Sequence, residues 1–184
     1  MRNLMVLAAT ALGAFSWAFP GIVRAQDDPA TLERRVKAAF VYQFAGYVEW
    51  PEATLAQPAQ PITIGVMGDD AIEGELTQVV AGRTIEAHPL TIRRVRNVDA
   101  AMGVHVLFVS HAERAKLSEL KSLNAPVLII SETDGALDQG SMINFVMVGG
   151  RVRFEVALDN AERRNLKLSS RLLTVAYFVR MAAQ

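Results

Sequence analysis

Short, almost wholly apolar segments alternate with segments of helical pattern, and this alternation constrains the fold of the chain more than any other feature. The apolar segments span residues 62–67, 104–109 and 126–131. Strands that are apolar throughout are typical of a sheet covered on both faces. Helices between them are typical of the crossovers that join parallel strands. The sequence therefore predicts an α/β fold of three layers, with a mostly parallel sheet and helices on both faces.

Residues that favour helix starts precede the expected helices. Asp28 followed by Pro29 predicts a first helix that runs to about Glu49, because these residues suit the N-cap and the first turn. Two later pairs have the spacing of a capping box: Asp70 with Glu73, and Ser110 with Glu113. Residues 83–95 are expected to form one or two strands, broken at His88–Pro89.

The end of the chain predicts a C-terminal antiparallel hairpin. Segments 141–148 and 151–158 flank Gly149–Gly150, a strong signal for a two-residue turn. Pairing about that turn sets Phe145 opposite Phe154 on an apolar face. The second face is mixed, with Asn144, Val146, Val148, Arg151, Arg153 and Glu155. Such a face is either solvated or helix-covered, or it is a surface for protein contacts, where arginine is enriched.

Two helical segments are expected after the hairpin. Asp159 is expected to cap a short turn of helix. Ser169 or Ser170 is expected to cap the last helix. Leu172, Leu173, Ala176 and Val179 recur at helical spacing, so Val179 is expected to belong to this last helix.

The first 25 residues have the order of a cleavable secretory signal peptide. Arg2 supplies positive charge, an uncharged and mostly apolar run spans residues 4–19, and Pro20–Gly21 precedes a cleavage site after Ala25. This run is shorter than the ~20 apolar residues of a spanning helix, which disfavours the alternative, an uncleaved membrane anchor. Residues 26–184 are therefore expected to form a single exported domain.

Charge and cysteine content exclude several classes of function. Cleavage would remove Arg2 and Arg24, which leaves 17 basic residues against 19 acidic ones and a net charge of −2. Without a basic excess, neither nucleic acid nor an anionic lipid surface is an expected partner. The chain has no cysteine, so thiol redox chemistry is excluded and stability must come from the hydrophobic core.

The motifs of the sequence indicate neither a metal site nor a cofactor. The histidines, His88, His105 and His111, match no metal-binding spacing. The chain also lacks a nucleophile elbow, a phosphate-binding loop and a dinucleotide fingerprint. We therefore expect structural histidines and no cofactor.

Two further features carry a weaker suggestion of chemistry. Asp69–Asp70 resembles the acidic pair of a receiver domain, but Ser110 stands where that domain needs its phosphoacceptor aspartate. Helix capping explains these residues better. An enzyme is the weakest hypothesis, with the strand-end Ser131 as its nucleophile, because no acid–base constellation can be assembled around it. No catalytic residue is expected.

Aromatic residues gather near the end of the first expected helix. Tyr42, Tyr47 and Trp50 lie there, and Trp50 is the only tryptophan after the signal peptide. Such a cluster either belongs to the core or lines a partly open pocket. Under the second interpretation, these residues and the nearby Arg83 would bind a small ligand. The protein would then be an exported sensor domain for a nucleotide or an aromatic amino acid.

Ordered motifs along nearly the whole exported chain resemble those of the YfiR/HmsC-like family of periplasmic proteins. They comprise residues 37–44 (KAAFVYQF), 48–51 (VEWP), 64–70 (IGVMGDD), 105–110 (HVLFVS), 140–145 (GSMINF), 152–156 (VRFEV) and 166–173 (LKLSSRLL). The number of these motifs and their order make the resemblance specific.

The resemblance implies a periplasmic regulator that acts as a homodimer rather than a catalyst. Such a protein binds and represses an inner-membrane sensor such as a diguanylate cyclase, and thereby controls cyclic di-GMP signalling and biofilm formation. An outer-membrane lipoprotein relieves the repression by sequestering the regulator. The resemblance also implies that Glu155 and Lys167 contact the partner, and the mixed hairpin face adds Arg153. Disulfide-based redox control, which family members can carry, is not expected in a chain without cysteine.

Overall fold

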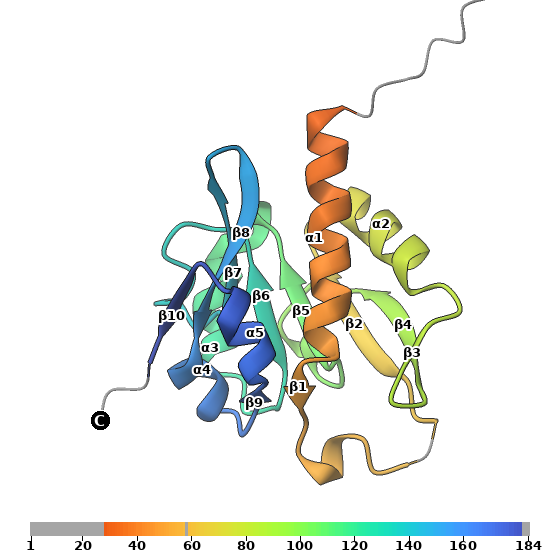
Figure 1. Ribbon diagram of the computed structural model, residues 1–184. Helices are drawn as coiled ribbons and strands as arrows, with labels where there is room; N and C mark the ends of the chain where they lie inside the picture. The colour runs from red at the N-terminus through yellow and green to blue at the C-terminus, as the bar shows by residue number, and fades with distance from the viewer. Residues whose placement is uncertain (1–27, 58, 182–184) are drawn as a thin grey trace, which may run out of the picture.

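The computed structural model describes residues 28–57 and 59–181 (Figure 1). The predicted signal peptide, residues 1–25, lies outside these residues. Within them, no helix is both long enough and apolar enough to cross a membrane. The described residues form a mixed α/β fold with five α-helices and a mostly parallel sheet of eight strands. The sequence-based prediction of a mostly parallel α/β fold is therefore confirmed.

In the described part of the chain, the strands of the main sheet lie in the order β10-β8-β7-β6-β5-β2-β4-β3. Their bounds are β2 (Ile62–Met67), β3 (Thr84–Ile85), β4 (His88–Arg94), β5 (Val106–Val109), β6 (Leu128–Ser131), β7 (Ile143–Val148), β8 (Arg151–Ala157) and β10 (Phe178–Arg180). Neighbouring strands are parallel except in the pairs β7–β8 and β3–β4. A smaller sheet pairs β1 (Val48–Glu49) with β9 (Lys167–Leu168).

Side chains from the central strands enter two separate cores. In β5, Val106 and Phe108 belong to one cluster, whereas Leu107 and Val109 belong to the other. Because successive side chains of a strand point to opposite faces, these clusters lie on opposite faces of the sheet. Four helices contribute to the first: α1 (Pro29–Ala45), α2 (Asp70–Val80), α4 (Leu158–Glu162) and α5 (Ser170–Val175). The short helix η2 (Asp99–Ala101) and α3 (Leu117–Lys121) contribute to the second.

Aromatic side chains join α1 to the hairpin of β7 and β8. The ring centroid of Phe154 lies 4.8 Å from that of Phe44 and 5.5 Å from that of Phe40. Phe145, which is opposite Phe154 in the register expected from the sequence, lies 5.8 Å from Phe44. One face of the hairpin is therefore buried against α1, and the alternate residues of β8 turn away from this core.

The first helix is shorter than the sequence predicts. It ends at Ala45, not near Glu49, and Gly46 follows it. The next residues form β1, in which Val48 is paired with Leu168 of β9. This pairing joins segments that are far apart in the sequence, and the periodicity of a single segment carries no information about it.

The cap of α2 is also displaced by one residue from the prediction. Its N-cap is Asp69 rather than Asp70, because Gly68, at φ +84°, reverses the chain one residue earlier. The Asp69 carboxylate accepts hydrogen bonds from the amides of Ala71 and Ile72, at 2.9 and 3.0 Å. The predicted capping box of Asp70 and Glu73 is therefore wrong.

Three other predicted caps differ from the structure, either in position or in hydrogen bonding. Asp28 and Ser110 occupy N-cap positions, before α1 and the short helix η3 (His111–Lys116), but neither side chain makes a capping hydrogen bond. Asp159 lies inside α4 (Leu158–Glu162), whose N-cap is Ala157. Sequence spacing located these helix starts to within a few residues, but it did not identify the bonds.

Residues 83–95 form two strands, but the turn between them is not at His88–Pro89. It lies at Glu86–Ala87, both of which have positive φ, at 48° and 71°. His88 and Pro89 begin β4, where they pair with Ile85 and Thr84 of β3. This proline is tolerated at the first positions of its strand.

The last helix ends earlier than its apolar spacing predicts. Ser169 caps α5 and accepts a hydrogen bond from the Arg171 amide at 3.2 Å. The helix ends at Val175, and Val179 lies in β10 instead, parallel to β8 and opposite Val156. The open edge of β8 offers backbone hydrogen bonds that a continued surface helix would leave unmade.

Two glycines offer a matched test of how tightly the second core packs against β2. A Cβ on Gly65 of β2 would lie 2.7 Å from Cγ2 of Val95, whereas one on Gly74 of α2 would meet nothing within 4 Å. Gly65→Ala should lower the free energy of unfolding by about 1–3 kcal/mol. Gly74→Ala should raise it by about 0.5–1 kcal/mol. Urea denaturation measures both, and a higher stability of Gly65→Ala would contradict the packing.

Candidate functional site

Strand β8 presents two exposed arginines at alternate positions. Phe154 and Val156 are buried, whereas Arg151 and Arg153 are exposed and Glu155 is half-buried. The alternation follows from the period of two in a strand, once Phe154 is held by the aromatic rings of α1. The hairpin therefore holds the two guanidinium groups at adjacent positions on one side of β8.

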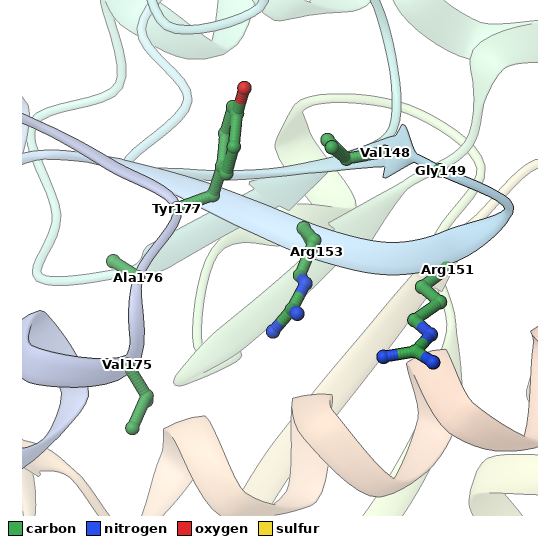
Figure 2. A pocket seen from close by; sticks show the side chains of 7 residues that line it. All are labelled: Val148, Gly149, Arg151, Arg153, Val175, Ala176 and Tyr177. Atoms are coloured by element: carbon green, nitrogen blue, oxygen red, sulfur yellow. The ribbon is translucent and has the colours of Figure 1, made fainter.

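A cleft lies between this part of β8 and the segment that joins α5 to β10. Its volume is about 500 Å³, and it is lined by Val148, Gly149, Arg151, Arg153, Val175, Ala176 and Tyr177. Figure 2 shows Arg151 and Arg153 extending from β8 in the same direction, whereas the Tyr177 ring points away from them. Val175 and Tyr177 are each 59% exposed. The cleft thus combines cationic and apolar surface.

Arg151 and Arg153 differ in their pairing from Arg163, which follows α4, and from Arg180 of β10. Within the described residues, neither of them forms an ion pair or a side-chain hydrogen bond with a protein group. Arg163, in contrast, is paired with Asp159. Unpaired guanidinium groups present forked donors that match carboxylates. The cleft is therefore suited to an acidic group of a partner.

Strand β10 is held in place by a set of ion pairs around Arg180. Its guanidinium contacts Asp159 at 3.0 Å and Asp138 at 2.7 Å, and it donates to the Leu137 carbonyl at 3.0 Å. Burial alone would raise the pKa of Asp159, but Arg180 and Arg163 outweigh burial and lower it. The Arg180 contacts fix one wall of the cleft, because Tyr177 immediately precedes β10.

The three predicted partner-binding residues do not all lie at this cleft. Arg153 lines it, and Glu155 follows two positions along β8, where it pairs with Asn144 of β7 and Phe178 of β10. Lys167 lies in β9, in the smaller sheet, opposite Glu49. The structure therefore brings Arg153 and Glu155 together and places Lys167 on a separate element.

Part of this surface is not indicated by the sequence patterns. Val175 and Tyr177 were not candidates, because the last helix was expected to continue through them. Arg151 was recognised on the mixed face but not as a site residue. The two arginines on one side of the hairpin are the sequence feature that could have indicated this surface. The position of β10, which brings Val175 and Tyr177 to it, cannot be predicted from local patterns.

The four predicted ligand-binding residues form separate contacts rather than one aromatic pocket. The guanidinium of Arg83 lies over the ring of Tyr42, with Cζ 5.1 Å from the ring centroid. Trp50 makes an edge-to-face contact with the imidazole of His105, at 5.8 Å between centroids. Tyr47 is half-buried, and its carbonyl accepts a hydrogen bond from the Ser169 amide.

His105 is a structural residue immediately before β5. Its Nδ1 accepts a hydrogen bond from the Thr63 amide at 3.0 Å, which requires the neutral imidazole. Burial lowers the pKa of His105 below its ordinary value, and the positive charge of a nearby His88 lowers it further, against the opposing effect of the Thr54 backbone. His105 thereby contributes to folding only while it is unprotonated.

The described residues contain no group of three or more His, Asp or Glu side chains that could hold a metal ion. Ser131 is wholly buried, and its hydroxyl has no hydrogen-bond partner within the described part of the chain. A serine nucleophile needs an adjacent base within hydrogen-bonding distance. The geometry around Ser131 does not provide one among these residues.

The fold thus carries an open cleft that combines cationic and apolar surface. The model of the YfiR/HmsC-like family matches residues 34–177. This chain therefore belongs to the YfiR/HmsC-like family, as its motifs indicate. The family is regulatory and non-catalytic.

The depressed pKa of His105 predicts how stability depends on pH. Below the ordinary histidine pKa of 6.5, the unfolded chain binds a proton that the folded chain does not. The free energy of unfolding should therefore decrease as the pH falls from about 7 to about 5. Thermal unfolding of His105→Gln should show a weaker decrease, whereas His111→Gln, at an exposed position, should follow the wild type. An unchanged pH dependence in His105→Gln would contradict this assignment.

Proposed function

We propose that this protein is a periplasmic regulator that binds and represses an inner-membrane sensor such as a diguanylate cyclase. Its action would control the level of cyclic di-GMP and, through it, biofilm formation. Cleavage after Ala25 would release residues 26–184 as a single domain into the periplasm. Membership of the YfiR/HmsC-like family is the observation that supports this proposal most strongly.

The mixed side of β8 is the proposed contact surface for the sensor. Arg153 and Glu155 supply opposite charges two positions apart on one strand, and exposed Val175 and Tyr177 supply apolar contact nearby. Interfaces commonly combine arginine and aromatic residues in this way. Lys167, on β9, extends the proposed surface to a second element.

Two further partners belong to this proposal. The protein acts as a homodimer, and an outer-membrane lipoprotein sequesters it to relieve repression. Both follow from the family resemblance rather than from a particular contact in the chain. An exported regulator needs a partner that crosses the membrane, because the regulator itself does not return to the cytoplasm.

A small-ligand sensor is the second candidate function, and one contact favours it. Arg83, whose guanidinium covers Tyr42, also lines a cleft of about 510 Å³ with Leu90 and Ile92. An arginine beside aromatic and aliphatic side chains suits a nucleotide or an aromatic amino acid. Titration of these compounds should then change the Trp50 fluorescence of the mature protein. An unchanged spectrum with every compound would contradict this candidate.

Deletion of the gene tests the main proposal directly. Cyclic di-GMP should rise severalfold, because repression of the cyclase is lost, and the wild-type gene should restore the low level. Arg153→Glu should restore it poorly, whereas Arg96→Glu, at an exposed arginine in the segment after β4, should restore it fully. Extracted nucleotide measured by mass spectrometry gives the level in each strain.

Folding and partner capture complete this experiment. Equal thermal stability of the two arginine variants would show that their difference does not arise from misfolding. Unchanged cyclic di-GMP after deletion, together with recovery of no membrane sensor on the purified protein, would overturn the proposal.

A further inference from the structure

The outer edge of β8 is covered along only part of its length. Strand β10 pairs with Glu155, Val156 and Ala157 of β8. In the described part of the chain, no strand lies beside residues 151–153 on that edge. The chain that enters β10 arrives from α5 across the cleft (Figure 2). The cleft is therefore also a gap in the outermost position of the sheet.

The backbone of Val152 faces this gap. The Phe154 carbonyl points to the outer edge, because it accepts a hydrogen bond from the Tyr177 amide at 2.8 Å. Peptide groups two residues apart along a strand point to the same edge, so the N–H and C=O of Val152 point outward as well. The hairpin geometry agrees, since Val148 and Arg151 flank the two-residue turn and form its first hydrogen-bonded pair.

We propose that an extended acidic segment of the protein partner occupies this gap and adds to the sheet as a strand beside residues 151–153 of β8. The inference rests on the proposed function, since it describes how the partner of that same surface binds. The Val152 peptide groups would supply backbone hydrogen bonds, and the side chains around the gap would select the sequence of the segment.

Charge favours an acidic segment of a different protein over a second copy of this chain. Arg151 and Arg153 lie on either side of Val152 and have no acidic partner among the described residues. A second copy related by a two-fold axis would pair antiparallel about Val152, which would set each Arg151 opposite an Arg153. Like charges directly opposite one another destabilise a strand pair. Carboxylates at these positions would instead pair with both arginines.

The apolar side chains of the cleft suggest the alternate positions of the bound segment. Val175 and Tyr177 are more than half exposed and border the gap. Because side chains of an added strand alternate between two faces, acidic residues toward the arginines would be interleaved with apolar residues on the other face. The fitting segment is therefore one of alternating acidic and β-branched or aromatic residues.

A short fluorescent peptide of alternating glutamate and valine is the probe for this mode of binding. Fluorescence anisotropy with the full mature chain should detect its binding. The double variant Arg151→Glu, Arg153→Glu should weaken that binding by about tenfold or more, because charge-assisted contacts are lost. Arg96→Glu is the matched control and should bind as the wild type does. A peptide with lysine in place of glutamate should bind poorly to the wild type and better to the double variant.

Backbone pairing requires a separate readout. Addition of the glutamate peptide should slow hydrogen exchange at the Val152 amide, and a peptide N-methylated at alternate residues should neither bind well nor protect this amide. If the charge reversal unfolds the hairpin, Arg151→Gln with Arg153→Gln removes the charges without introducing repulsion and should also weaken binding.

Three results would overturn the inference. They are equal binding of the glutamate and lysine peptides, equal binding of the N-methylated peptide, or an unprotected Val152 amide at saturating peptide. Failure of the proposed function is distinguishable, because it would leave cyclic di-GMP unchanged on gene deletion while the peptide still bound at β8.

Discussion

The packing of Phe154 against Phe40 and Phe44 is the contact on which the candidate surface depends. It fixes which face of β8 is buried under α1, and a shift of one residue would reverse every side chain of the strand. With Phe154 buried, Arg153 must point away from the core. The arginines are exposed as a consequence of core packing.

The central fold was predictable because its signals are local. The apolar segments at β2, β5 and β6 and the Gly149–Gly150 turn each specify their structure within a few residues. The errors occur where a distant segment decides the outcome. Val48 leaves the helical pattern to pair with Leu168, and Val179 leaves it to pair with Val156. Tertiary pairing overrides local periodicity in both places.

The site was predictable to the same extent. Arg153 and Glu155 could be assigned to one side of the hairpin from alternation alone, and the structure places them there. Val175 and Tyr177 reach the cleft only because β10 lies beside β8 and Arg180 holds it there. The proposed function needs no more than such a surface, because binding at an exposed edge can shift a partner's conformational equilibrium without any chemistry.

Site-specific crosslinking in living cells tests the central claim, that the cleft beside β8 is where this protein contacts its membrane partner. A benzophenone-bearing amino acid would replace Tyr177, which lines the cleft, or Met102, which is equally exposed near β4. We predict that the Tyr177 position crosslinks to an inner-membrane sensor and that the Met102 position does not. Crosslinking of that sensor from Met102 alone would contradict it.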